Sequence, residues 1–256
     1  MFKKIQIFVL AVATFGNVNA QKTKINSGER PKLVVGLVVD QMRWDYLYRY
    51  ENKFGKGGFQ RLLGEGYSLN NVHIPYIPTV TAIGHTSIYT GSVPSIHGIA
   101  GNDWTDKATG KNVYCTADED MKPVGTDNKR SGSHSPKNLW STTMTDQLMI
   151  ASNFKSKVVG VSLKDRASIL PAGHNPTGAF WFDDSNGKFI TSSYYMNELP
   201  KWVNDFNNQK VPEKLLANGW QTALPISEYT ESTADNVTWE KPVGTAKDPV
   251  FPYNNL

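Results

Sequence analysis

Residues 77–91 read Ile77-Pro78-Thr79-Val80-Thr81-Ala82-Ile83-Gly84-His85-Thr86-Ser87-Ile88-Tyr89-Thr90-Gly91. Pro78 stiffens the entry to this stretch and Gly91 is a residue type that often ends helices, so the pattern predicts a short helix over residues 82–89. Thr81 would stand at the helix N-terminus, where partial positive charge and unpaired N–H groups attract phosphate-like anions. A Thr at this place is either an N-cap or a nucleophile, and the stretch alone favours the N-cap.

An acidic residue upstream supports the nucleophile. The apolar run Leu33–Val39 ends directly before Asp40. Its nearly unbroken, mostly branched residues indicate a strand that is buried on both faces, as in a parallel sheet. Ligands of open α/β sheets bind beyond the carboxyl ends of strands, so Asp40 is placed to hold a metal. Asp40 could equally cap the helix or turn that follows, and the residues alone leave both readings open.

A second apolar strand, Val158–Leu163, is followed directly by Lys164-Asp165-Arg166. In an extended segment residues i and i+2 face alike, so we expect Lys164 and Arg166 to point the same way. An Arg can grip two phosphoryl oxygens and a Lys supplies a point charge, although solvated charges at a strand end are the ordinary alternative. Together with Asp40, these cations predict a site on one rim of the sheet.

The rest of the chain predicts further elements around this sheet. They are a helix ending at Phe59–Gly66, a short strand over 67–74, a helix from Ser135-Pro136 to about Asn153 with Trp140, Thr143, Met144, Gln147, Leu148 and Ala151 on one mostly apolar face, a hairpin of 179–182 with 188–191, and a helix over 201–207. From Gly178 onward the character of the sequence changes, and the part after the predicted 201–207 helix is irregular and rich in Trp, Thr, Pro and Asn. We therefore expect residues 178–256 to form an inserted cap or accessory region that adds nothing to the sheet.

Taken in order, Asp40, the segment Pro78-Thr79-Val80-Thr81 and the segment His97-Gly98-Ile99-Ala100-Gly101-Asn102 resemble the alkaline phosphatase superfamily. The resemblance is to the branch with a threonine nucleophile, which includes nucleotide pyrophosphatases/phosphodiesterases and secreted bacterial alkaline phosphatases. Lys164 and Arg166 are similar to the pair that the phosphate monoesterases of this branch add. The resemblance runs from about Pro31 to the last residue and implies an α/β fold, with a mostly parallel sheet flanked by helices and an inserted cap region.

The resemblance also implies roles for single residues. Thr81 would be the nucleophile and, with Asp40, a zinc ligand, while Asn102, Lys164 and Arg166 would bind the phosphate. Asn102 could otherwise be a turn residue between Gly101 and Asp103. A Thr hydroxyl is nearly inert at its free pKa, so this chemistry implies zinc, and the family uses two zinc ions.

The later metal ligands of the family, an Asp-x-x-x-His motif, an Asp-His pair and a distant His, have no counterpart here. We therefore expect an incomplete, N-terminal part of a larger zinc-dependent enzyme, inactive alone, that would hydrolyse phosphate monoesters through a phosphothreonine. The alternatives are a phosphodiesterase or nucleotide pyrophosphatase of the same branch and a non-catalytic secreted binding module. A sulfatase is disfavoured because its Cys/Ser-x-Pro-x-Arg segment is absent.

The single cysteine and the five histidines add little to this site. Cys115 excludes an internal disulfide and is expected to be a small buried residue. We expect a structural hydrogen-bonding role for His85 and a turn position for His97. His134 and His174 are expected in loops, where they could be merely exposed.

Composition and the N-terminus bound the remaining functions. Residues 1–20 contain Lys3 and Lys4, a short apolar core and a Val18-Asn19-Ala20 cleavage pattern, which predicts a signal peptide and a periplasmic or secreted protein, with residues 21–177 as the N-terminal part of the α/β domain. The net charge of +4 over 256 residues, without a basic tract, gives no support to nucleic-acid binding. The expected partners are small-molecule phosphate monoesters, with no stable membrane insertion.

Overall fold

The computed structural model describes residues 31–254, and the chain divides into two units, Met1–Val38 and Val39–Leu256. The predicted signal peptide lies outside the described residues. In the first unit, residues 31–38 form no helix or strand, and Leu33 and Leu37 are 79% and 78% exposed. The buried strand predicted over residues 33–39 is therefore wrong. A strand forms only where a neighbour takes its backbone hydrogen bonds, and no strand among the described residues pairs with this segment.

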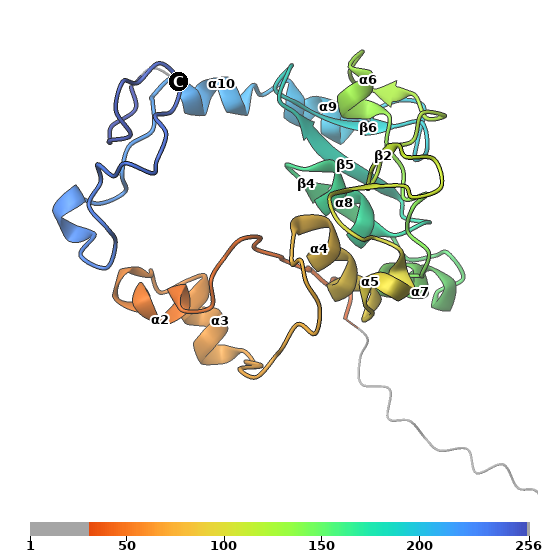
Figure 1. Cartoon of the computed structure of the whole chain (residues 1–256), viewed down its shortest axis with the longest axis horizontal. Coiled ribbons are helices and arrows are strands. Elements are labelled where there is room, and N and C mark those ends of the chain that lie inside the picture. Colours follow the sequence, from red (N-terminus) through yellow and green to blue (C-terminus); the bar gives the residue numbers. More distant parts are fainter. Residues whose placement is uncertain (1–30, 255–256) are drawn as a thin grey trace, which may run out of the picture. The chain divides into compact units, whose positions relative to one another are not determined.

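The second unit contains both helices and strands (Figure 1). Its helices are α2 Tyr46–Arg49, α3 Phe59–Glu65, α4 Thr81–Thr90, α5 Pro94–His97, α6 Lys129–Gly132, α7 Met144–Ala151, α8 Asp165–Ala172, α9 Lys201–Asn207 and α10 Val211–Leu216, with the 3₁₀ turns η1 Glu51–Lys53 and η2 Ile226–Glu228. Its strands are β1 Asp103–Thr105, β2 Asn112–Tyr114, β3 Pro123–Val124, β4 Val159–Ser162, β5 Gly178–Asp183 and β6 Lys188–Ser192.

The main sheet has four strands in the order β3-β6-β5-β4. It is mixed: β4 and β5 pair in parallel, while β6 is antiparallel to β5 and to β3. The predicted hairpin is present as β5 and β6, with Trp181 opposite Ile190. However, β5 also pairs with β4, so residues beyond 177 do add strands to the sheet, contrary to our expectation. Strand β5 is also almost entirely buried, as expected of a strand inside a sheet and not of an accessory region.

Helix α8 lies between the sheet and α4 and belongs to both parts of the core (Figure 1). Its residues Ile169 and Ala172 pack with Ala179, Trp181 and Ile190 of the sheet. The neighbouring residue Leu170 faces the other way, into a cluster with Ala82, Ile83, Ile99, Cys115 and Leu139. Because adjacent residues of a helix point about 100° apart, one short helix can bury side chains on two sides. The start of α8 is thereby fixed against both α4 and the sheet.

Gly160 in β4 allows α8 to lie close to the strand. A Cβ atom at this position would collide with the backbone oxygen of Ser168 and contact the Cβ of Ala172 at 3.0 Å. The absence of a side chain at residue 160 therefore sets the spacing between α8 and the sheet.

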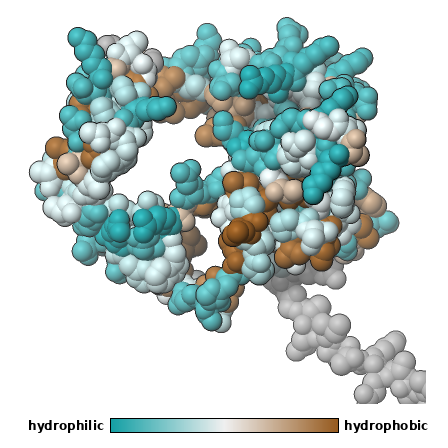
Figure 2. Space-filling model, in the orientation of Figure 1, coloured by the Kyte–Doolittle hydropathy of each residue, from teal (hydrophilic) through white to brown (hydrophobic). Residues whose placement is uncertain are grey.

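Helix α4 is one residue longer at each end than predicted, and Gly91 ends it in the left-handed conformation with a φ of 63°. The residues Ala82, Ile83, His85 and Thr86 are buried, whereas Ile88 is exposed. Figure 2 shows apolar surface where α4 and α5 lie in Figure 1, and Ile96 of α5 is also exposed. Helix α4 therefore packs on one side only within the part of the chain that the structure describes.

The helix predicted from Ser135 is shorter, because α7 begins only at Met144. Tertiary contacts take the backbone of the preceding residues: Ser135 N donates to Thr116 O at 2.9 Å, and Trp140 N donates to His97 O at 3.0 Å. Thr143 then starts the helix through a capping box with Asp146. The predicted apolar face is also wrong, since Trp140, Met144 and Leu148 are exposed. These contacts replace the local pattern that favoured one long helix.

Three of the smaller predictions have mixed outcomes. The helix before Gly66 is present as α3, and the helix over 201–207 is present as α9. The strand predicted over 67–74 is wrong: these residues carry no strand pairing, and Tyr67 is 90% exposed.

None of the described helices combines the length and the apolarity that crossing a membrane requires.

A buried ion pair ties the start of α7 to the residues after α8. His174 Nδ1 lies 3.1 Å from Asp146 Oδ2, and the other ring nitrogen contacts Leu139 O at 2.9 Å. Burial opposes ionisation of Asp146, but hydrogen bonds from His174, Thr143 and Asn175 outweigh it and leave its pKa well below the usual range. The hydrogen bond to Asp146 raises the pKa of His174. The expectation that His174 is merely exposed is therefore wrong.

Candidate active site

Thr81 is the first residue of α4, and its side chain does not cap the helix. The N-cap residue is Val80, and no side chain caps this end. Instead, Thr81 Oγ1 donates a hydrogen bond to Asp40 Oδ2 at 2.9 Å, across 41 residues of sequence. The ordinary N-cap reading of Thr81 is therefore wrong, and Thr81 is a half-buried residue beside the exposed Asp40.

Asp40 makes the turn contact that was one of its two readings, and it also contacts Thr81. Its Oδ1 accepts from the backbone N–H of Gln41 at 2.9 Å, which fixes the turn, and its Oδ2 accepts from Thr81. Gln41 has a positive φ of 59°, so the chain turns sharply directly after Asp40. The carboxylate is thus held in place by the turn that it helps to form.

Asn102 lies at the same helix end. Its Oδ1 accepts the backbone N–H of Ala82 at 2.9 Å, so the amide group satisfies a helix donor next to Thr81. Its backbone oxygen accepts from Cys115 N at 2.9 Å. Because Oδ1 is taken, the Nδ2 group is the part of this side chain that remains to donate to an anion. The role of Asn102 is therefore more than that of a turn residue.

Lys164 and Arg166 come at the start of α8, and not along an extended segment. Lys164 is the N-cap residue, with φ −110° and ψ 136°, and makes no side-chain cap; Arg166 belongs to the first helical turn. The expectation that the two side chains share one face of an extended strand is therefore wrong, since the helix begins between them. Strand pairing ends at Ser162, and Lys164 N donates to Ser162 Oγ at 3.3 Å.

Arg166 is held by a network that sequence reasoning missed. Its Nη1 donates to the hydroxyl of Tyr114 at 2.8 Å, and this hydroxyl donates to Asp165 Oδ1 at 2.9 Å. The second oxygen of Asp165 accepts from Thr116. Burial, together with the charge of Asp165, raises the pKa of Tyr114 far above its usual range, so Tyr114 stays a neutral donor. The Nε of Arg166 is buried without a hydrogen-bond partner among the described residues.

These contacts connect Arg166 and Asn102 with the start of α4 at Thr81. Tyr114, which holds Arg166, precedes Cys115, whose N–H bonds to Asn102, and Asn102 in turn bonds to α4 beside Thr81. Cys115 is fully buried, as predicted. Nothing in the sequence links Tyr114 to Arg166, 52 residues further on, whereas the position of Asp165 between two cations could have drawn attention to it.

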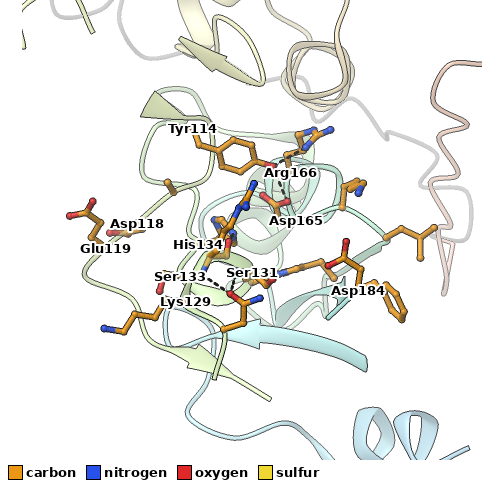
Figure 3. Close-up of a pocket in the computed structure, with 17 residues that line it drawn as sticks. Tyr114, Asp118, Glu119, Lys129, Ser131, Ser133, His134, Asp165, Arg166 and Asp184 are labelled. Carbon is orange, nitrogen blue, oxygen red and sulfur yellow. Dashed lines mark hydrogen bonds between the residues drawn. The ribbon is translucent and has the colours of Figure 1, made fainter. Parts of the chain in front are cut away.

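A cavity of about 1210 Å³ opens next to the cations (Figure 3). Lys164, Asp165 and Arg166 line one part of it together with Tyr114, whereas Asp40, Thr81 and Asn102 are absent from its described lining. Figure 3 shows Tyr114, Asp165 and Arg166 grouped together, with His134 beside them and Lys129 further away. Of the predicted site residues, Lys164 and Arg166 therefore border this space.

The described residues offer a metal only part of a ligand set. The carboxylate of Asp40 and the hydroxyl of Thr81 are two oxygen donors 2.9 Å apart, which suits ligands of one ion. Within residues 31–254, however, no group of three or more His, Cys, Asp or Glu side chains could hold a metal. A catalytic zinc usually has three protein ligands, so these residues fit a zinc site only as a part of it.

The histidines have structural hydrogen bonds. His85 contacts Thr81 O at 2.9 Å, as expected for a structural role. His97 is fully buried at the end of α5 and contacts Ser87 Oγ at 3.0 Å; burial lowers its pKa, although its own backbone hydrogen bond opposes this. His134 is buried and bonds to Arg130 O, so the expectation that it is exposed is wrong.

Comparison with known proteins shows which family this chain belongs to. The family model of type I phosphodiesterase / nucleotide pyrophosphatase matches residues 34–250. Alkaline phosphatase PafA of Elizabethkingia meningoseptica is 71% identical over 99% of this chain and 46% of its own length. Alkaline phosphatase PhoV of Synechococcus elongatus is 52% identical over 98% of this chain and 47% of its own length. The chain thus spans about half the length of these relatives.

A crystal structure of wild-type PafA superposes with a TM-score of 0.88 at 74% identity, covering 90% of this chain and 44% of that one. The α/β fold that the resemblance implied is therefore confirmed as alkaline-phosphatase-like. Because the family model covers most of the sequence, the chain belongs to the type I phosphodiesterase / nucleotide pyrophosphatase family of the alkaline phosphatase superfamily.

Proposed function

We propose that this chain carries the nucleophile and the phosphate-binding residues of an exported enzyme that hydrolyses small phosphate monoesters. The observation that carries the proposal is the hydrogen bond from Thr81 Oγ1 to Asp40 Oδ2 at the start of α4. Its proton points to the carboxylate, which leaves the lone pairs of the hydroxyl oxygen free for attack. The names of PafA and PhoV, both alkaline phosphatases, support the same reaction class.

The reaction would run in two steps. Thr81 Oγ1 gives up its proton to solvent and forms a bond to phosphorus, while the bond from phosphorus to the alcohol oxygen breaks and that oxygen takes up a proton as the alcohol leaves. Water then attacks the phosphothreonine: its oxygen bonds to phosphorus, the bond between phosphorus and Thr81 Oγ1 breaks, a proton of the water returns to Thr81, and inorganic phosphate departs. Arg166 and Lys164 would neutralise the charge of the phosphoryl oxygens, and the Nδ2 of Asn102 would donate a hydrogen bond to one of them; such stabilisation is the main contribution a protein makes to this chemistry.

Zinc would be held by Asp40 and Thr81 together with ligands outside the described residues. When bound, it would supply positive charge that lowers the pKa of the hydroxyl. The residues of this chain do the rest: Asp40 orients the Thr81 hydroxyl, and the Tyr114–Asp165 network aims Arg166. The predicted signal peptide supports an exported, periplasmic or secreted enzyme.

Two alternatives are weaker on this geometry. The family description itself names phosphodiesterases. A diester has one charged oxygen fewer and a second ester group to house, so the cationic pair of Lys164 and Arg166 favours a monoester. A non-catalytic secreted module would account for the partial ligand set, but it gives no reason for the contact between Thr81 and Asp40.

The test is Thr81→Ala in a protein of full family length that carries this sequence. With an aryl phosphate, we expect kcat to fall at least a thousandfold, since each ~1.4 kcal/mol of barrier is a factor of ten. Acid quenching after exposure to radiolabelled substrate should trap a phosphoprotein that the variant lacks. Thr90→Ala, at the other end of α4, removes a comparable hydroxyl that bonds to Thr86 O and should leave both results unchanged. Near-normal turnover in Thr81→Ala would refute the assignment.

A further inference from the structure

The cavity beside Lys164 and Arg166 is larger than a phosphate requires. Its volume of about 1210 Å³ exceeds the usual 300–1000 Å³ of sites for whole small molecules. If the phosphoryl group binds at Lys164 and Arg166, the remaining space is available for the alcohol part of the substrate. The chemistry of the far wall then decides which alcohols fit.

Helix α6 forms that far wall and is fixed from behind. Trp181 Nε1 donates to Ser131 O at 2.7 Å, and His134 Nε2 contacts Arg130 O at 3.0 Å. The amide oxygen of Asn128 accepts the N–H groups of Arg130 and Ser131, and Gly132 lies so close to Pro123 that a Cβ atom would collide with it. The backbone of α6 is thus held by its contacts, while the side chains of Lys129 and Arg130 are exposed at the cavity.

The charges around the cavity are unequally compensated. Of its carboxylates, Asp118 pairs with Lys137 at 3.0 Å, whereas Asp165 accepts hydrogen bonds from two neutral hydroxyls and makes no ion pair among the described residues. Glu119 and Asp184 are exposed and make no ion pair among the described residues. Lys129, Arg130, Lys164 and Arg166 likewise make none within the described part of the chain. The uncompensated cations therefore outnumber the uncompensated carboxylates.

If the phosphoryl group binds Lys164 and Arg166, the adjacent cations Lys129 and Arg130 of α6 remain unbound at the cavity. Figure 3 shows Lys129 lying apart from the group of Arg166, Asp165 and Tyr114. Lys129 therefore lies apart from Arg166, and a single phosphate bound at Arg166 leaves Lys129 available to a second anion.

We infer that this cavity binds the alcohol part of the substrate, and that Lys129 and Arg130 select alcohols that carry a second phosphate group. The inference rests on the proposed function, because it takes Lys164 and Arg166 as the site of the phosphoryl group that is transferred. Charge-assisted hydrogen bonds from a Lys and an Arg suit a phosphate, the Arg through two parallel N–H groups. The substrate class is that of bisphosphorylated small molecules.

The experiment measures binding to the chain by isothermal titration calorimetry at low ionic strength. The probes are propyl phosphate and a series of alkanediol bisphosphates with two to six carbons between the phosphates. We expect at least one bisphosphate to bind about tenfold more tightly than propyl phosphate, which is about 1.4 kcal/mol. Lys129→Gln/Arg130→Gln should raise the Kd of that bisphosphate to the level of propyl phosphate. Lys107→Gln/Lys111→Gln, which removes the same charge from exposed residues outside the cavity, should keep the preference.

Three outcomes would overturn the inference: no bisphosphate is preferred, the preference survives Lys129→Gln/Arg130→Gln, or the control variant loses it equally. A third variant, Lys164→Gln/Arg166→Gln, separates this result from the proposed function. It should weaken the binding of both kinds of probe. If it leaves propyl phosphate binding intact while the α6 variant still loses the preference, the assignment of Lys164 and Arg166 fails, and the second-phosphate site on α6 stands.

Discussion

At the scale of single residues, the candidate site depends on neutral groups that hold charged ones. The neutral hydroxyl of Tyr114 joins Arg166 to Asp165. The neutral amide of Asn102 accepts the backbone N–H of Ala82 in α4, next to Thr81, and adds no negative charge that would repel an anion. The result is that Arg166 keeps its full charge: burial lowers its pKa, but the bond to Tyr114 and the charges around it raise it overall. An anion would meet a guanidinium that is already oriented.

The cationic pair tests the substrate class. In a protein of full family length, Lys164→Gln/Arg166→Gln should reduce kcat/KM for a phosphate monoester at least a hundredfold more than for a diester, about 2.7 kcal/mol of difference. The reason is the extra negative charge of the monoester. Parallel assays with an aryl phosphate and its methyl diester measure both values. Equal losses would mean that Lys164 and Arg166 do not confer a preference for monoesters, and would favour the diesterase alternative.

The His174–Asp146 pair predicts a pH dependence of stability. The raised pKa of His174 makes its contribution complete below about 6.5, the usual value, and lost as the pH rises through its folded-state pKa. The lowered pKa of Asp146 makes its contribution present above about 3.9 and lost as the pH falls through its folded-state pKa. The pair should therefore stabilise the fold most between these two values.

His174→Gln should accordingly lower Tm most near pH 5 to 6, and less as the pH rises toward 9. Thermal unfolding of both proteins across this range gives the difference at each pH. His73→Gln, a change of an exposed histidine that is hydrogen-bonded to the nearby Asn71, serves as the control. A difference that stays constant over the whole range would show that the charge on His174 contributes nothing.

At the scale of elements, local patterns predicted those that are stabilised locally. The helix α4 has its glycine stop, and the hairpin of β5 and β6 has its turn residues, so both were predictable from the sequence. The segment before α7 was not predictable, because Trp140 N bonds to His97 O and Ser135 N bonds to Thr116 O. The place of β5 beside β4 likewise depends on a parallel pairing that no local pattern encodes.

Of the candidate site, the sequence likewise predicted the residues but not the contacts between them. Residue types at helix and strand ends pointed to Thr81, Asp40, Lys164 and Arg166, and the resemblance pointed to Asn102. The contact between Thr81 and Asp40 spans 41 residues, and the bond from Arg166 to Tyr114 spans 52, so only the folded chain could reveal them. The helical start of α8 at Asp165 also had no strong signal, since Lys164 is a poor N-cap.

The close packing of α8 on β4 predicts the effect of Gly160→Ala. The added Cβ would collide with Ser168 O, so α8 must move, and overpacking of this kind costs about 1–3 kcal/mol. Urea unfolding should show this loss. Gly84→Ala, in α4, adds the same methyl group where no atom lies within 4 Å and should leave the stability equal or slightly higher. A neutral Gly160→Ala would show that α8 is not confined by this residue.

At the scale of the whole molecule, the chain spans less than half of its relatives, and its described ligand set is partial. We therefore expect the purified chain to bind zinc weakly and to hydrolyse phosphate esters negligibly. Equilibrium dialysis followed by elemental analysis should find less than one tightly bound zinc per chain. Asp40→Ala should lower the residual binding. Two tightly held zinc ions, or turnover that Thr81→Ala abolishes, would mean that these residues form a complete site.

The start of α8 sets stability against the proposed role of Lys164 in phosphate binding. Cations are unfavourable at a helix N-terminus, and an N-cap Asn in place of Lys164 would typically stabilise a helix by about 1 kcal/mol. A laboratory selection for heat resistance alone would therefore favour loss of Lys164. Under the proposed role of this residue, the selected variants would be more stable and would bind phosphate less tightly. Any programme that evolves this chain toward robustness needs a simultaneous screen for anion binding.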